Sequence, residues 1–165
     1  MSPSTPKRTE IDFLADQLER SFHGGAWHGP AVAEVLDGVD AASAAAKVLP
    51  AHSIWEMVHH LTVWCDIARQ RMTGEGGSCC PPEELDWPSP AVASSAAWKV
   101  SKKALADAHR HLHAALLKLS DADLERPVAG SDPTLRGLIF GVLQHNTYHA
   151  GQIALLKKAA RRSAA

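Results

Sequence analysis

The apolar positions of this chain repeat with the period of an α-helix in four long segments, and no segment shows the two-residue alternation of a strand. We predict helices over residues 10–22, 54–73, 91–119 and 132–161. A short helix is expected at 30–36, and further helical turns within 40–49. Four amphipathic helices without a competing strand signal predict an all-α fold, a four-helix bundle. Residues 1–9 are polar and expected to be disordered, which leaves 10–162 as a single domain.

The ends of two predicted helices carry recognisable capping residues. Ser53 and Glu56 have the spacing of a capping box, which gives Glu56 a structural role, and Gly74 ends that helix. Asp132 and Pro133 suit the N-cap and first position of the last helix. The connection between the second and third helices is long and rich in glycine and proline. Its length permits a crossover instead of a tight antiparallel turn.

Polar side chains interrupt the apolar stripe of the last helix. They are His145, Asn146, His149 and Gln152. His145 and His149 are four residues apart and therefore share one face, one turn apart. Burying an unpaired polar group costs roughly 2–7 kcal/mol, and a metal ion removes that cost because neutral imidazole is the commonest metal ligand. The alternatives are hydrogen-bonded core histidines or a wet groove.

Helical angle separates two adjacent histidines of the second helix. The apolar stripe centres on Leu61 at about 100° per residue. His60 then lies about 100° from that centre and borders the core, whereas His59 lies about 160° away and is expected to face solvent. His60 is therefore the expected third imidazole. On the third helix His109 lies on the apolar stripe, where it is either a core histidine or a further ligand.

The composition and net charge of the chain limit the kinds of partner that it is expected to bind. The chain has 165 residues, 45% of them hydrophobic, with a net charge of −1, so no electrostatic attraction to nucleic acid or to an anionic membrane is expected. No apolar run approaches the roughly 20 residues that span a bilayer, and no signal peptide is apparent. We expect a cytoplasmic protein. Cys65 should be inert on its apolar stripe, and Cys79 and Cys80 are expected to be reduced thiols, with a redox or metal role as the alternative.

Three imidazoles with one open position make a catalytic type of metal site, whereas a structural site is usually closed by four protein ligands. The open position would lower the pKa of water or bind a thiol or carbonyl. His28 and His109 are the other candidates for a ligand. The chain has no glycine-rich phosphate loop, no HExxH and no GxSxG motif.

Several motifs together resemble the DinB/YfiT-like superfamily of metal-dependent enzymes over about residues 10–160. They are Trp27-His28-Gly29-Pro30, His52-Ser53-Ile54-Trp55-Glu56 leading to His60, Asp86-Trp87-Pro88, Ala97-Trp98, and Gln144-His145 through His149-Ala150-Gly151-Gln152 to Lys158. The resemblance implies an up-down-down-up bundle with a crossover, often a homodimer, and a divalent ion held by His60, His145 and His149. The family often has Arg where this chain has Ala150, which changes a contact with a substrate anion.

The resemblance also implies a function. Some relatives use the metal in reactions of low-molecular-weight thiols, and others have no assigned reaction. We expect a thiol-dependent S-transferase that acts on a small molecule and binds Zn or Ni. The alternatives are a metal-dependent hydrolase and a non-catalytic metal-binding or stress-related protein. The candidates for the pocket lining are Trp27, His28, Trp64, His109 and Gln152.

Overall fold

The computed structural model describes residues 8–75, 81–128 and 134–163. Its helices, in chain order, are α1 (Glu10–His23), α2 (Val32–Leu36), α3 (Ala41–Ala45), α4 (Ile54–Thr73), α5 (Glu83–Asp86), α6 (Ser95–Leu116), the 3-10 helix η1 (Asp121–Glu125) and α7 (Leu135–Ser163). Within these ranges no strand occurs, and Pro127 and Thr134 form an isolated antiparallel bridge. The predicted all-α fold is therefore confirmed.

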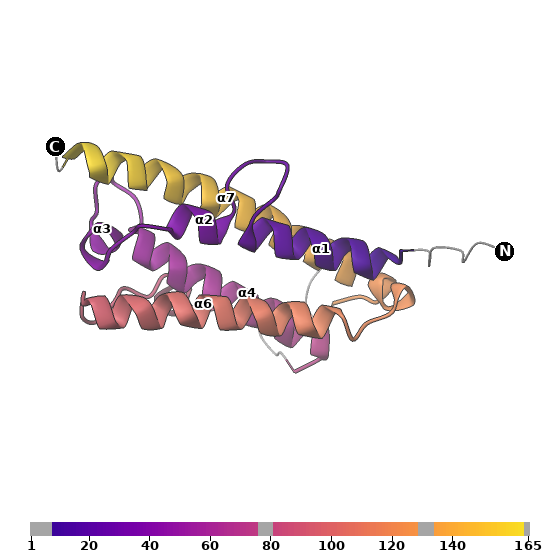
Figure 1. The fold of residues 1–165 in the computed structure, drawn as a ribbon. Coiled ribbons are helices and arrows are strands. Elements are labelled where there is room, and N and C mark those ends of the chain that lie inside the picture. Colours follow the sequence, from indigo (N-terminus) through magenta and orange to yellow (C-terminus); the bar gives the residue numbers. More distant parts are fainter. Residues whose placement is uncertain (1–7, 76–80, 129–133, 164–165) are drawn as a thin grey trace.

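The four long helices lie in two pairs (Figure 1). α1 and α7 run in one direction, and α4 and α6 run side by side in the other (Figure 1). These directions are those expected of an up-down-down-up bundle. The connection from α4 to α6 must therefore return along the length of the molecule, and it carries α5. None of the described helices combines the length and apolar character needed to cross a bilayer.

Side-chain caps set the beginnings of the long helices. At α1, Thr9 Oγ1 accepts a hydrogen bond from Asp12 N at 3.1 Å, and Asp12 accepts one from Thr9 N at 3.0 Å. At α4, the predicted capping box is present: Ser53 N donates to Glu56 Oε2 at 2.7 Å, and Glu56 N donates to Ser53 Oγ at 3.2 Å. Gly74 ends α4 in the left-handed conformation, with φ +78°.

Helix α6 is shorter than the sequence pattern predicts. It starts four residues later and ends three residues earlier than the predicted range 91–119. Ser94 Oγ accepts a hydrogen bond from Ala97 N at 3.1 Å, and this cap decides the start of the helix. Within residues 40–49 only Ala41–Ala45 is helical.

Some predictions concern residues outside the described ranges. They are the disorder of the N-terminus up to residue 7, the thiols of Cys79 and Cys80, and the cap formed by Asp132 and Pro133. Within residues 1–9 the structure describes Arg8 and Thr9, and Thr9 is the N-cap of α1.

The core consists of two apolar clusters, one toward each end of the bundle. One contains Phe22, Val32, Val35, Leu36, Val39, Ile54, Trp55, Met57, Val58, Leu61, Trp98, Leu105, Ile153 and Leu156, among others. The other contains Ile11, Leu14, Leu18, Cys65, Met72, Leu112, Leu116, Leu124, Leu135 and Ile139, among others. On α1 and α7, polar residues lie between members of the two clusters, and on α4 and α6 His60 and His109 interrupt the apolar residues. Buried polar side chains in this middle layer are Ser21, His60, His109, Asn146 and His149.

Candidate metal centre

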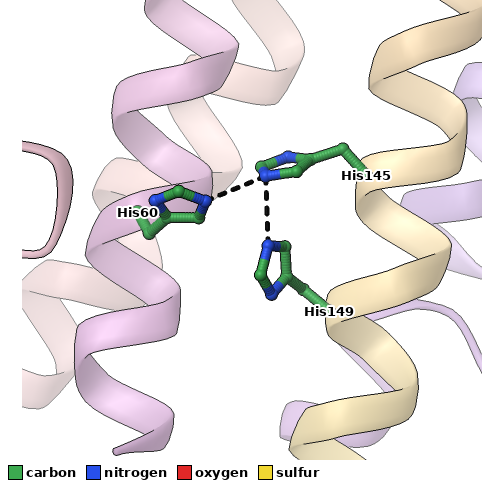
Figure 2. Close-up of side chains that lie close together, drawn as sticks. All are labelled: His60, His145 and His149. Atoms are coloured by element: carbon green, nitrogen blue, oxygen red, sulfur yellow. Dashed lines mark hydrogen bonds between the residues drawn. The ribbon is translucent and has the colours of Figure 1, made fainter. Parts of the chain in front are cut away.

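Three histidines from two helices converge in the middle layer (Figure 2). His60 comes from α4, and His145 and His149 come from successive turns of α7. His145 Nε2 lies 2.9 Å from His60 Nε2 and 3.1 Å from His149 Nε2. Their ligand atoms all lie within 4.8 Å of one another, so the group could hold a metal ion. The structure thus brings together the three residues that the sequence singled out as ligands.

The outer nitrogens of two rings are held by acceptors. His60 Nδ1 lies 3.0 Å from the Asp86 backbone oxygen and 2.9 Å from Asp86 Oδ1. His149 Nδ1 lies 2.7 Å from Gln152 Oε1. Because these oxygens only accept, both Nδ1 atoms carry the proton. In a neutral ring the proton on Nδ1 leaves Nε2 with a free lone pair, so His60 and His149 both direct an acceptor toward His145.

This arrangement of lone pairs fits a cation. His145 Nε2 can donate a proton to only one of its two neighbours, so at least one close nitrogen pair has no hydrogen between its atoms. Nitrogens bound at roughly 2.0–2.1 Å to a tetrahedral ion are about 3.3 Å apart, close to the separations seen here. Ligating histidines also commonly donate their other N–H to a carboxylate or carbonyl, as His60 does. The donor set therefore fits a divalent transition-metal ion.

Burial keeps these rings neutral. Burial, together with the neighbouring His149 and His60, lowers the pKa of His145 to about 3. Burial also lowers the pKa of His149 to about 4. The pKa of His60 is lowered by burial as well, against the opposing effect of Asp86. Neutral imidazole is the form that binds metal, so the site is ready for an ion at neutral pH.

The connection between α4 and α6 completes one side of the site. Trp87 stacks on His60, with ring centroids 3.7 Å apart and planes 5° from parallel. Asp86 Oδ1 also accepts a hydrogen bond from Trp64 Nε1 at 2.7 Å. Asp86 therefore joins His60 and Trp64, one turn apart on α4, and orients the His60 ring.

A cavity of about 330 Å³ reaches the histidines between α4 and α7. His60 and His145 line it, together with Trp64, Cys65, Ala68, Arg71, Gly137, Leu138, Gly141, Val142 and Asn146. Arg71 is the cationic residue of this lining, and its Cζ lies 5.9 Å from the centre of the Trp64 ring. Arg71 Nε is buried and, among the residues that the structure describes, has no hydrogen-bond partner.

Cys65 lines the same cavity, yet it is 2% exposed. Burial raises the pKa of its thiol to about 12. The thiolate is the nucleophilic form, so Cys65 remains a neutral thiol, as its place on the apolar stripe predicted.

The other predicted pocket residues lie in different places. Trp64 lines the cavity beside the histidines, and Gln152 orients His149. His28 and Trp27 line a separate cavity, which α1 and the opposite side of α7 form, so the structure does not bring them to the histidine group. His109 is fully buried on α6 and lines neither cavity.

The prediction that His59 faces solvent is wrong. His59 Nδ1 lies 2.6 Å from the Pro88 backbone oxygen, and His59 Nε2 lies 2.9 Å from Ser101 Oγ and 3.1 Å from Trp55 Nε1. A helical angle indicates exposure only where a helix has one buried face. α4 instead contacts α3, α5, α6 and α7, so the face opposite Leu61 is covered as well.

Two functional residues were missed by reasoning from the sequence. Asp86 is the last residue of α5, a helix of four residues that is too short to show a hydrophobic period, although it belongs to the motif Asp86-Trp87-Pro88 that carried the resemblance. Arg71 follows Trp64 by seven residues, or two helical turns, and that spacing would have placed both on one face.

One comparison with known proteins identifies a family that covers most of the chain. The family model described as the DinB superfamily matches residues 26–153, a segment that includes His60, His145 and His149. No curated protein and no solved structure matches the chain.

Proposed function

The chain belongs to the DinB superfamily, and on that basis we propose that it is a metal-dependent enzyme whose ion is held by His60, His145 and His149. The observation that carries this proposal is the convergence of the three Nε2 atoms. At His60 and His149 the oxygen that accepts from Nδ1 leaves the lone pair of Nε2 facing inward. Zn and Ni are the metals that we expect, because imidazole ligands suit both. When bound, the ion supplies Lewis-acid chemistry and lowers the pKa of a coordinated thiol or water.

The cavity beside the histidines supports an enzyme over a closed binding site. It brings small molecules to His60 and His145 along a wall made by Trp64, Leu138 and Val142. An apolar lining with a few polar groups is typical of sites for small organic ligands. A protein that only stores metal needs no such cavity next to its ligands.

We infer a thiol-dependent S-transferase from the position of Arg71. Arg71 lines the same cavity as His60 and His145, and its Nε has no hydrogen-bond partner among the described residues. A guanidinium pairs readily with a carboxylate in two parallel hydrogen bonds. A low-molecular-weight thiol that carries a carboxylate could therefore bind Arg71 while its sulfur lies at the histidines. Asp86 and Gln152 would hold the rings in place during the reaction.

A metal-reconstitution screen tests this proposal. The protein is stripped of metal, loaded with Zn or Ni, and mixed with a panel of electrophiles and each common cellular thiol. Consumption of thiol and electrophile together, lost in His60→Ala and His145→Ala variants, is the expected result. Turnover of esters or amides without added thiol would show a hydrolase instead. Tight metal binding with no turnover in any combination would favour a non-catalytic metal-binding or stress-related protein.

A homodimer and a cytoplasmic location are part of the same proposal. The family resemblance suggests the dimer, and the cytoplasmic location stays a prediction. Sedimentation equilibrium of the metal-loaded protein tests the dimer, which predicts twice the mass of the chain.

A further inference from the structure

A second group of metal-ligating side chains lies where α1 packs against α6. Glu19 and His23 are four residues apart on α1, and His109 and His113 are four residues apart on α6. Residues at this spacing share a helix face. The two pairs face each other across the helix interface, where each of the three imidazoles has a nitrogen within 4.0 Å of the Glu19 carboxylate.

The distances bring these groups to one carboxylate. Glu19 Oε2 lies 3.6 Å from His23 Nε2, and Glu19 Oε1 lies 3.6 Å from His113 Nδ1 and 4.0 Å from His109 Nδ1. The ligand atoms of Glu19, His23 and His109 all lie within 4.8 Å of one another. The rings of His23 and His109 meet edge to face, with centroids 5.5 Å apart. None of these residues belongs to the first histidine group.

One ring nitrogen of His109 is buried without a hydrogen-bond partner among the described residues. His109 Nε2 lies 3.2 Å from the Leu18 backbone oxygen, which can only accept, so Nε2 carries the proton. In the neutral ring His109 Nδ1 therefore holds a lone pair. This atom is buried in a residue that is 0% exposed, and among the residues that the structure describes it has no hydrogen-bond partner. Its nearest ion-pair partner is the Glu19 carboxylate, which is also an acceptor.

Two acceptors, His109 Nδ1 and the Glu19 carboxylate, face each other, and protonating His109 to join them is unfavourable. Burial lowers the pKa of His109 to about 4, so the ring stays neutral at physiological pH. A cation between the lone pair and the carboxylate satisfies both. The stack of Phe22 on His109, with ring centroids 4.0 Å apart, holds the ring in place. A backbone carbonyl that fixes the outer N–H is the usual support of a ligating histidine.

We propose that Glu19, His23, His109 and His113 form a second divalent-metal site that joins α1 to α6. Three imidazoles and a carboxylate suit zinc, and four protein ligands close the coordination sphere, as in structural sites. The side chains of His23, Glu19 and His113 are 57%, 40% and 22% exposed, so an ion can reach the site from solvent. The bound ion would tie together helices that are far apart in the sequence.

Counting zinc in variants tests the second site independently of the first. After dialysis against buffered zinc, the wild-type protein should retain two equivalents per chain. The His145→Ala/His149→Ala variant should retain one, and adding His23→Ala/His113→Ala to it should remove the remaining equivalent. His23 and His113 are not in the buried core, so their loss leaves the fold intact, which circular dichroism verifies. His111→Ala, an exposed residue of α6, is the matched control and should keep full binding.

Melting gives a second measurement. Zinc should raise the Tm of the His145→Ala/His149→Ala variant, and this rise should vanish when Glu19→Gln is added. The proposal is overturned if the His145→Ala/His149→Ala variant binds no zinc. It is also overturned if the zinc content of this variant and its rise in Tm are unchanged by the further substitutions at Glu19, His23 and His113. Because the first site is absent from this background, the outcome does not depend on the proposed enzymatic function.

Discussion

At the scale of single residues, His59 and His60 are neighbours on α4 whose rings are oriented in the same way but contact different partners. Both rings face a backbone oxygen of the α4–α6 connection with Nδ1, His60 at Asp86 and His59 at Pro88. Their Nε2 atoms then face different partners. That of His60 points at His145, whereas that of His59 lies within hydrogen-bond distance of Ser101 and Trp55.

This difference predicts separate effects of two substitutions. His60→Ala should lower metal affinity sharply, because one of three ligands is lost. His59→Ala should keep the metal but lower the free energy of unfolding by about 1–3 kcal/mol, because a network of partly buried hydrogen bonds loses its centre. Metal content after dialysis and urea denaturation measure the two effects. Equal loss of metal in both variants would contradict the assignment of His60 as the ligand.

Arg71 carries a second prediction at this scale. In the proposed reaction, Arg71→Met should raise KM for the anionic thiol by about 10- to 100-fold, because a hydrogen bond to a charged group is lost. Metal content should not change, since Arg71 does not touch the ligand atoms. Arg69→Met is the matched control, because Arg69 pairs with Glu75 and does not line the cavity. An unchanged KM would remove Arg71 from the binding site.

At the scale of elements, the connection between α4 and α6 is fastened along one side of α4. Ser89 Oγ donates to Glu56 Oε1 at 2.6 Å, close to where Pro88 and Asp86 contact His59 and His60. Glu56 thus joins the capping box of α4 to the connection. Burial alone would raise the pKa of Glu56, but hydrogen bonds from Ser89, Ser53 and Lys47 outweigh it and lower that pKa to about 2.

Glu56→Ala should therefore destabilise the protein and loosen the connection together. The expected loss is about 1–3 kcal/mol, from the helix cap and from buried partners left unpaired. The Glu56 contribution is present above the unfolded pKa near 4.5 and is lost as the pH falls toward about 2. Urea denaturation at pH 7 and pH 3 measures it, and the two proteins should differ less at pH 3. Glu84→Ala, at an exposed position of α5, should have little effect at either pH.

At the scale of the whole molecule, a layer of polar groups separates two apolar clusters and joins both histidine groups. Asn146 Nδ2, next to His145 on α7, donates to Ser21 Oγ at 3.1 Å. Ser21 Oγ donates to the Leu18 oxygen at 2.9 Å, and His109 Nε2 donates to that same oxygen. A bundle with neutral histidines in its middle must lose stability when those histidines take up protons.

The metal-free protein should therefore become less stable as the pH falls from about 6.5 to about 4. The pKa values of His109 and His149 are about 4 in the folded chain, against an ordinary value near 6.5, so the unfolded chain binds more protons in this window. The contribution of each histidine to the free energy of unfolding is fully present above the unfolded pKa. By pH 5 the loss is on the order of 1–2 kcal/mol for each of them. Urea denaturation in the presence of a chelator measures this loss.

Metal and substitutions provide the controls for this pH dependence. His149→Gln should give a shallower loss, whereas His111→Gln should keep the wild-type dependence because that residue is exposed. Bound metal competes with protons, so the difference in Tm between the loaded and stripped proteins should shrink toward acid. A stability of the stripped protein that does not change between pH 7.5 and pH 5 would contradict the burial of neutral histidines.

The sequence by itself determined the helices and which three histidines lie on or beside their apolar stripes. Apolar residues repeat every three to four positions, and Ser53 with Glu56 marks the start of α4, because both signals act within one or two turns of a helix. Helical angle placed His145 and His149 on the apolar stripe of the last helix and His60 at the border of the core. The predicted single domain over 10–162 stays a prediction.

Only the tertiary structure decided which groups face those histidines. Asp86 reaches His60 from a connection, and His59 is covered by the same connection and by α6. Glu19 on α1 lies 4.0 Å from His109 on α6, although the two residues are 90 positions apart in the sequence. Helical periodicity gives the direction of a side chain from its own axis. What lies opposite depends on how distant segments pack, and no local pattern carries that information.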